Sequence, residues 1–248
     1  SSVAAWVGAS DFTAALGQAL LVPGETGAPL MALAGFGTAE TRSRARFHLA
    51  AAAAKLPKGS YAIASGLPAD QAEVEVLGWL LAGYRFTRYK SAKPMGARLV
   101  APEGLDTARL LALAEGEYLT RDLINTPASD MGPPDLEQAA RDLAAKHGAR
   151  IEVITGEALL ERNFPMVHTV GRAADRAPRL IDMTWGETGP HITLVGKGVC
   201  FDTGGLNLKP GESMGLMKKD MGGAANVLGL AHMLMATGVA LRLRVLIP

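Results

Sequence analysis

Short apolar runs alternate along the chain with longer amphipathic stretches. Brief apolar runs are typical of buried strands, and apolar residues at helical spacing are typical of the helices that cover them. In the first part of the chain the pattern predicts strands at 30–34, 61–65 and 98–101 and helices at 39–56, 69–84 and 105–124. We therefore expect a small α/β domain over residues 1–103, with a boundary near Glu103 that follows a polar segment containing lysine and proline.

The alternation continues in the second part of the chain, from residue 104 to residue 248. Gly148 ends a predicted helix at 135–147, and Pro133 or Pro134 suits the first turn of that helix. The pattern also predicts strands at 150–154, 179–185, 191–195 and 241–247 and a helix at 222–237. The near-continuous apolar runs favour strands buried on both faces of a mainly parallel sheet. The predicted class is thus α/β, with a mixed, mainly parallel sheet flanked by helices.

Composition limits the classes of partner. The chain has 25 Lys and Arg against 24 Asp and Glu, a net charge of +1, so no overall field draws it to nucleic acid or anionic lipid. The single cysteine, Cys200, cannot form an internal disulfide, and its isolation excludes a thiolate metal site and favours a reducing compartment. No apolar run is long enough to span a membrane, and no signal pattern opens the chain. We expect a cytoplasmic protein.

Candidate chemistry is concentrated between Val195 and Ala225, where charged residues alternate with glycines. Lys197 follows a predicted strand, and ligands bind beyond the carboxyl ends of strands in open α/β sheets. Asp202 lies in the glycine-flanked loop that follows, and Asp220 precedes the helix at 222–237. Two carboxylates suit a divalent cation, and a lysine joins them only when its amine is unprotonated, which a nearby dication favours.

Each of these residues also has an ordinary structural interpretation. Asp220 suits a helix N-cap, Asp202 suits an Asx-turn, and a lysine after a strand is usually solvated. The flanking glycines favour close approach of the backbone to a ligand, and three ionisable groups in one segment favour a site. A phosphate-binding loop is disfavoured, because neither G-x-x-x-x-G-K-[ST] nor G-x-G-x-x-G follows a predicted strand.

The segment 195–225 resembles the signature region of the leucyl aminopeptidases, the M17 family of dinuclear metallo-exopeptidases. Stretches at 84–91, 121–128 and 171–181 also resemble that family, and the resemblance runs unevenly from about Leu77 to Pro248. Residues before Leu77 are similar to the family's N-terminal α/β domain only in their rhythm. The resemblance implies that residues 104–248 are the first portion of a metallopeptidase catalytic domain.

The resemblance also implies roles for five side chains. Lys197, Asp202 and Asp220 would bind two divalent metal ions, Zn²⁺ or Mn²⁺, with Asp202 bridging them. Lys209 would be catalytic, polarising the scissile carbonyl or stabilising the oxyanion, while the metal pair binds the α-amine and supplies a hydroxide nucleophile. Met217 would line the pocket for the first side chain of the substrate. Lys209 equally suits a surface turn, and Met217 a core position.

The expected function is that of a metal-dependent aminopeptidase. The resemblance implies release of N-terminal residues from peptide substrates, with a broad preference for apolar residues such as leucine, by a homo-hexamer. The chain lacks the family's later Asn-Thr-Asp-Ala-Glu-Gly-Arg stretch, which supplies further ligands and an arginine. Two metal ions are short of ligands without it. We therefore expect these 248 residues to be the first part of a longer polypeptide, and activity to need the remainder.

Two other functions stay open. An inactive family member would keep the fold alone, although four retained ionisable groups in one loop argue against that. A DNA-binding or structural role would use a basic stretch interleaved with aromatic residues, formed by Arg85, Arg88, Lys90, Lys93 and Arg98. The near-zero net charge disfavours DNA binding, and such a stretch is commonly a solvated face.

Overall fold

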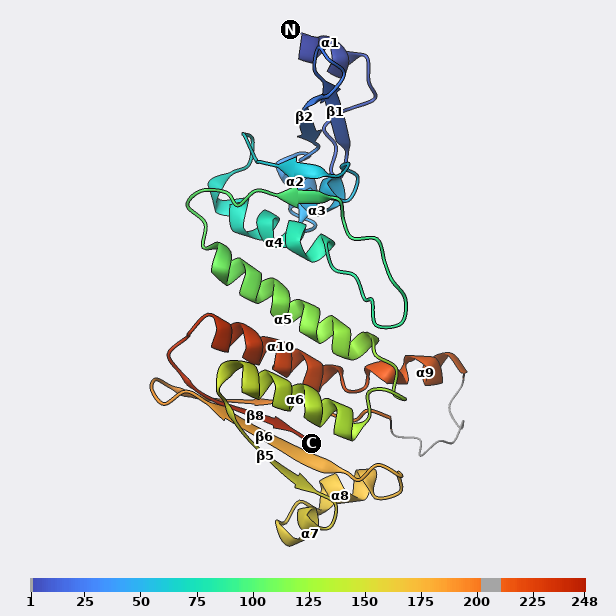
Figure 1. Cartoon of the computed structure of the whole chain (residues 1–248), viewed down its shortest axis with the longest axis vertical. Coiled ribbons are helices and arrows are strands. Elements are labelled where there is room, and N and C mark those ends of the chain that lie inside the picture. The colour runs from blue at the N-terminus through green and yellow to red at the C-terminus, as the bar shows by residue number, and fades with distance from the viewer. Residues whose placement is uncertain (1, 202–210) are drawn as a thin grey trace. The chain divides into compact units, whose positions relative to one another are not determined.

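The computed structural model describes residues 2–201 and 211–248. The chain divides into two compact units, Ser1–Ala114 and Glu115–Pro248. The division falls within α5 (Thr107–Asn125), the longest helix of the described chain (Figure 1). No described helix is both long and apolar enough to cross a membrane.

The first unit contains two small sheets. Strand β1 (Ala19–Pro23) pairs antiparallel with β2 (Pro29–Ala34), and β3 (Gly59–Tyr61) pairs parallel with β4 (Ala97–Leu99). The helical segments are α1 (Ser2–Gly8), α2 (Ala39–Arg42), α3 (His48–Ala53), η1 (Ala69–Gln71) and α4 (Ala72–Ala82). The small core of this unit lies between α3, α4 and β4 and contains Leu49, Ala53, Trp79 and Ala97.

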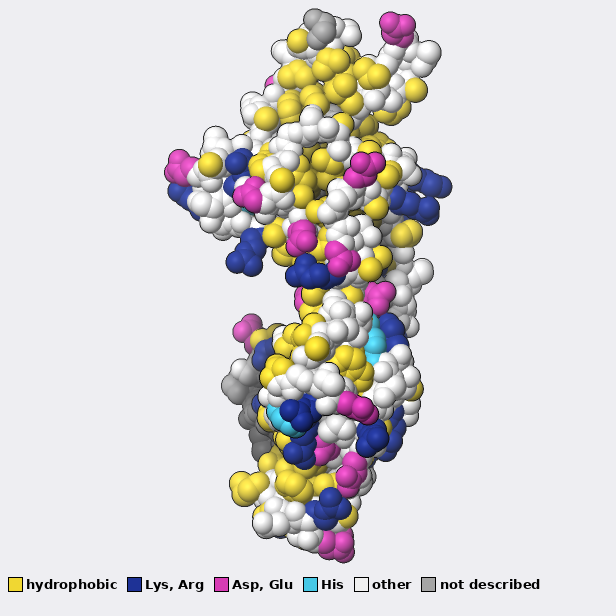
Figure 2. All heavy atoms as spheres, turned by 90° about the vertical axis from the view of Figure 1, so that its left-hand side faces the viewer, with side chains coloured by type: hydrophobic (Ala, Val, Ile, Leu, Met, Phe, Trp, Pro, Cys, Tyr) yellow, Lys and Arg dark blue, Asp and Glu magenta, His cyan; other side chains and the backbone are white. Residues whose placement is uncertain are grey.

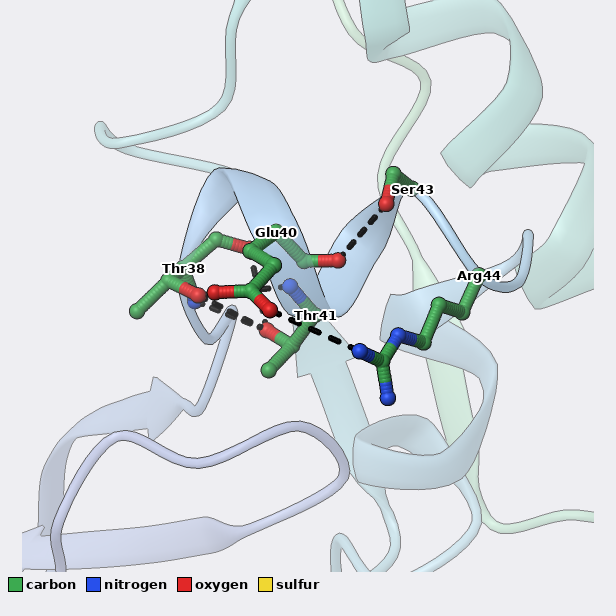
Figure 3. Close-up of polar contacts among 5 residues, drawn as sticks. All are labelled: Thr38, Glu40, Thr41, Ser43 and Arg44. Atoms are coloured by element: carbon green, nitrogen blue, oxygen red, sulfur yellow. Dashed lines mark hydrogen bonds and ion pairs between the residues drawn. The ribbon is translucent and has the colours of Figure 1, made fainter.

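The single helix expected at 39–56 is two short helices. Helix α2 begins with a reciprocal cap, in which Thr41 N donates to Thr38 Oγ1 at 3.3 Å and Thr38 N donates to Thr41 Oγ1 at 2.9 Å (Figure 3). Helix α2 ends at Arg42, and Phe47, the residue before α3, adopts a left-handed backbone with φ of 63°, which no continuous right-handed helix contains. A break of this kind leaves no trace in the spacing of apolar residues.

A buried carboxylate from α4 accepts a hydrogen bond from the first turn of α3. Glu75 on α4 is 2% exposed, and its Oε2 accepts a hydrogen bond of 2.7 Å from Leu49 N. The contact satisfies an N–H of the first helical turn that lacks a partner within the helix. Gly78 on α4 packs directly against Phe47: a Cβ added at Gly78 would lie only 2.6 Å from Phe47 Cβ.

The second unit contains a four-stranded sheet with the order β5-β6-β8-β7. Its strands are β5 (Arg150–Thr155), β6 (Arg179–Trp185), β7 (His191–Val195) and β8 (Arg242–Ile247). The mixed α/β class is confirmed. Parallel pairs do not predominate among the described strands, however, because β5–β6 and β6–β8 are antiparallel and only β7–β8 is parallel. Apolar runs report burial and not strand direction.

Burial of β7 on both faces was also expected, and it is wrong for this chain. Ile192 is 37% exposed and Val195 66% exposed. Among the described strands β7 lies at the sheet edge and pairs with β8 alone. In β8 the burial alternates, with Leu243 and Val245 buried and Arg244 exposed, so one face of the sheet is covered.

Helices α6 (Pro133–His147) and α10 (Gly222–Ala236) cover that face (Figure 1). Gly148 ends α6 in a left-handed conformation with φ of 68°, as the sequence predicted. The shorter helical segments are α7 (Ala158–Glu161), α8 (Pro165–Gly171), α9 (Gly211–Gly215) and η2 (Leu216–Lys219). Leu136, Leu228 and Met183 are among the most deeply buried side chains of the core between helices and sheet.

Candidate functional site

Lys197 lies just beyond the carboxyl end of β7. Gly196 N donates to Leu246 O at 3.0 Å and Gly198 N donates to Pro248 O at 2.9 Å, so the parallel ladder continues past Val195. These two bonds hold the backbone on either side of Lys197 against β8. The Lys197 side chain is 58% exposed, and its amine is therefore free to reach a neighbouring group at the sheet edge.

Asp220 lies between η2 and α10, and its side chain approaches Lys197. Lys197 Nζ is 3.6 Å from Asp220 Oδ2, and the Asp220 side chain is only 19% exposed. The structure thus brings together two of the three residues that the sequence proposed as metal ligands. Their proximity depends on the turn of η2, in which Asp220 N donates to Met217 O at 3.0 Å.

A second lysine contacts the same carboxylate. Lys219 Nζ lies 3.7 Å from Asp220 Oδ1 and its side chain is 59% exposed. Sequence alone does not distinguish Lys219 from its neighbour Lys218. Because each oxygen of Asp220 faces one ammonium group, the single negative charge of the carboxylate is outnumbered by two positive charges at this edge.

The remaining site residues differ in how far the structure describes them. Asp202 and Lys209 lie outside the described residues. Met217, expected in a substrate pocket, lies in η2 and is 4% exposed. Cys200 is 5% exposed, and burial, followed by the charge of Asp135, raises the pKa of its thiol to about 12. The thiol stays protonated and offers no thiolate ligand.

Histidines form a separate polar cluster in the second unit. His147 Nε2 and His232 Nδ1 are 3.0 Å apart, and His232 Nε2 lies 3.2 Å from Glu115 Oε2. Lys146 Nζ forms an ion pair with the same Glu115 oxygen at 3.2 Å. Burial, the largest cause, lowers the pKa of both histidines, and Lys146 lowers them further while Glu115 opposes the shift.

The described part of the chain contains no group of three or more His, Cys, Asp or Glu side chains that could hold a metal ion. The chemistry that the described residues offer at the sheet edge is the pair of the Lys197 amine and the Asp220 carboxylate, with the Lys219 amine also in contact with that carboxylate. This pair fits part of a divalent-cation donor set, because a mostly buried carboxylate is a hard oxygen donor and an unprotonated lysine is a nitrogen donor.

The basic stretch at 85–98 belongs to the first unit. Arg85 Nη1 donates to the backbone oxygens of Ala82 at 2.9 Å and Tyr84 at 2.6 Å. The Arg88 guanidinium lies 5.8 Å from the centre of the Tyr89 ring. Both arginines contact their own loop.

On the face drawn in Figure 2, basic and acidic side chains of the second unit are interspersed and do not form a patch of one sign.

Comparison with known protein families gives two matches that together cover most of the chain. Residues 118–248 match the catalytic domain of the cytosol aminopeptidase family, and residues 1–102 match the M17 aminopeptidase N-terminal domain. A probable cytosol aminopeptidase from Rhodococcus opacus is 31% identical over 233 residues, which are 86% of this chain and 46% of the relative. One from Roseiflexus castenholzii is 40% identical over 171 residues, or 62% of this chain and 35% of the relative.

Solved structures give the same result. The cytosol aminopeptidase of Coxiella burnetii is 39% identical with a TM-score of 0.88, over 100% of this chain and 54% of that one. The bottromycin maturation enzyme BotP, solved in complex with Mn, is 34% identical with a TM-score of 0.82, over 98% of this chain and 56% of that one. The chain spans about half the length of these structures, and less than half of the two curated relatives.

Proposed function

Because the chain belongs to the M17 cytosol aminopeptidase family, we propose that it contributes to a metal-dependent aminopeptidase that removes N-terminal residues from peptides. The observation that carries this proposal is the 3.6 Å approach of the Lys197 amine to the Asp220 carboxylate at the end of β7. Two residues remote in sequence meet at the edge where α/β sheets bind ligands. The family match and the contact are independent of each other.

In this proposal Lys197, Asp202 and Asp220 would hold two divalent metal ions. Bound ions of this kind supply Lewis acidity, which polarises a peptide carbonyl and lowers the pKa of a water molecule. Lys197 contributes only as the neutral amine, so its proton must leave before the ligand set is complete. Asp220 is suited to its role because it is shielded from solvent and already faces Lys197.

Two further residues act on the substrate in this proposal. Lys209 stabilises negative charge that develops on the scissile carbonyl oxygen, which is the usual contribution of a fixed cation beside an acyl centre. Met217 forms part of the wall that receives the first side chain, consistent with an apolar preference. The name of one relative supports the apolar preference: a solved Caenorhabditis elegans protein of 30% identity and TM-score 0.64 is a leucine aminopeptidase.

The metal, assembly and location are proposed on the same footing. Mn²⁺ or Zn²⁺ is the proposed cofactor, and the structure of BotP in complex with Mn supports the former. A homo-hexamer is the proposed assembly. The cytoplasm is the proposed location, supported by relatives described as cytosol aminopeptidases.

The test is direct metal binding with a matched carboxylate control. In the full-length protein we expect Asp220→Asn to lower Mn²⁺ affinity, measured by isothermal titration calorimetry, by at least about tenfold, and to lower hydrolysis of leucine p-nitroanilide in parallel. Asp142→Asn removes an exposed carboxylate on α6, whose Oδ1 accepts from Gln138 Nε2 at 2.7 Å, and should leave both unchanged. Wild-type affinity and activity in Asp220→Asn would refute the proposal.

A further inference from the structure

The first turn of α10 lies directly against the backbone of Lys197. A Cβ at Gly223 would be 2.8 Å from Lys197 N and 3.3 Å from Lys197 Cβ. Side chains essentially never approach a backbone nitrogen that closely, so any residue larger than glycine at 223 must displace Lys197 or tilt the helix. The contact is matched on the opposite side, where a Cβ at Gly196 would be 2.6 Å from Gly223 O.

A hydrogen bond accompanies this packing. Ala224 N, in the first turn of α10, donates to Lys197 O at 2.9 Å. The first N–H groups of a helix have no partner within the helix, and the N-cap residue Met221 makes no side-chain cap with the described residues. The Lys197 carbonyl takes the place of a capping side chain. One residue therefore presents its amine to Asp220 and its carbonyl to the helix that follows Asp220.

The position of the amine depends on this contact. Asp220 directly follows η2, and only Met221 separates it from α10, so the position of its backbone is tied to the start of that helix. Lys197 is fixed to the same helical turn through Gly223 and Ala224. The distance between the Lys197 backbone and α10 therefore limits where the Lys197 side chain starts relative to Asp220, whose Oδ2 lies 3.6 Å from Nζ.

We infer that Gly223 is a positioning residue for the metal site, an inference that rests on the proposed ligand roles of Lys197 and Asp220. Gly223 contacts no metal in this scheme. Its lack of a side chain lets the strand end and the helix start approach closely enough for the amine and the carboxylate to share one ion. Small misplacements of ligating groups reduce affinity strongly, because coordination distances are narrow.

The neighbouring glycine provides a matched control. A Cβ at Gly222 would meet only one described atom within 4 Å, Ile124 Cδ1 at 3.7 Å, which is an ordinary contact. Gly222→Ala and Gly223→Ala add the same methyl group to the same helical turn, one residue apart. Only the second pushes against Lys197. A difference between them thus reports the contact and not the general effect of alanine on the helix.

The experiment measures Mn²⁺ affinity of the full-length protein by titration calorimetry, with Mn²⁺ electron paramagnetic resonance as a second readout and circular dichroism to verify folding. We expect Gly223→Ala to bind Mn²⁺ at least about tenfold more weakly and Gly222→Ala to match the wild type. Leu234→Ala removes a partly buried side chain from the other end of α10 and is the control for helix stability. It should also keep wild-type affinity.

The possible outcomes separate the two levels of the argument. Wild-type affinity in Gly223→Ala, or an equal loss in Leu234→Ala, would overturn the positioning role while leaving the proposed function intact if Asp220→Asn still loses affinity. Wild-type affinity in Asp220→Asn would overturn the proposed function and this inference together. If Gly223→Ala does not fold, Gly196→Ala compresses the same contact from the strand side and is measured in the same way, with the same two results deciding.

Discussion

Adding one methyl group where α5 crosses α10 should destabilise the second unit. A Cβ at Gly229 would lie 2.1 Å from Thr120 Oγ1 and 2.6 Å from Gly116 O. The Thr120 hydroxyl is buried and lies within hydrogen-bonding distance of two carbonyl oxygens, Gly116 O at 3.0 Å and Ala225 O at 3.2 Å. The new methyl group of Gly229→Ala would therefore overlap with the Gly116 backbone oxygen and with the buried Thr120 hydroxyl.

The size of the effect follows from three contributions. Overpacking of this kind costs about 1–3 kcal/mol. Displacing the Thr120 hydroxyl from its acceptors leaves a buried polar group unsatisfied, which costs about 1–3 kcal/mol when complete. Alanine is favoured over glycine within a helix by roughly 0.5–1 kcal/mol. Because relaxation of the helices relieves the first two terms in part, we expect a net loss of about 1–4 kcal/mol in the free energy of unfolding.

Thermal denaturation followed by circular dichroism measures this loss. For a chain of this size each kcal/mol shifts the melting temperature by roughly 2–4 °C, so Gly229→Ala should melt about 2–16 °C below the wild type. Gly222→Ala adds the same methyl group to the same helix with only an ordinary contact, Ile124 Cδ1 at 3.7 Å, and should melt between the wild-type temperature and about 4 °C above it. A melting temperature for Gly229→Ala equal to or above that of the wild type would refute the close crossing of the helices.

Two other measurements test polar groups on the helices: the histidine pair His147 on α6 and His232 on α10, and the buried Glu75 on α4. The lowered pKa values of His147 and His232 mean that the unfolded chain binds more protons than the native chain at mildly acidic pH, so the stabilisation is complete above about pH 6.5 and is lost as the pH falls below it. Urea unfolding between about pH 7.5 and 5 should show this fall, and His232→Gln should flatten it. In the first unit, Glu75→Leu removes the acceptor of Leu49 N and should cost about 1–3 kcal/mol in the free energy of unfolding. Glu75→Gln keeps an acceptor oxygen and should cost less, and urea unfolding followed by circular dichroism distinguishes the two variants.

The spacing of apolar residues located most elements of the second unit but not their pairing. The strands at Arg179–Trp185 and His191–Val195 have the bounds that the pattern predicted, and α6 ends at His147 before Gly148 as expected. The direction of each strand depends on how the connections cross the sheet, which apolar spacing does not record. In the first unit, β1 at Ala19–Pro23 was not predicted, although its five residues form a short apolar run; it pairs with β2 alone in a two-stranded sheet.

For the candidate site, the sequence indicated which charged residues to consider, and the structure added which glycine packs against them. Charged residues among glycines after a strand led to the proposal of Lys197, Asp202 and Asp220, because ligands bind beyond the carboxyl ends of strands in open α/β sheets. Sequence could not rank the adjacent glycines 222 and 223, since both permit close approach in principle. Successive residues of a helix point about 100° apart, so only one of two neighbours can face the strand end. That choice depends on where α10 starts, and its start is fixed by the Lys197 carbonyl bonded to Ala224 N. Lys197, which marks the candidate site in the sequence, thus also places Gly223, and not Gly222, against the end of β7.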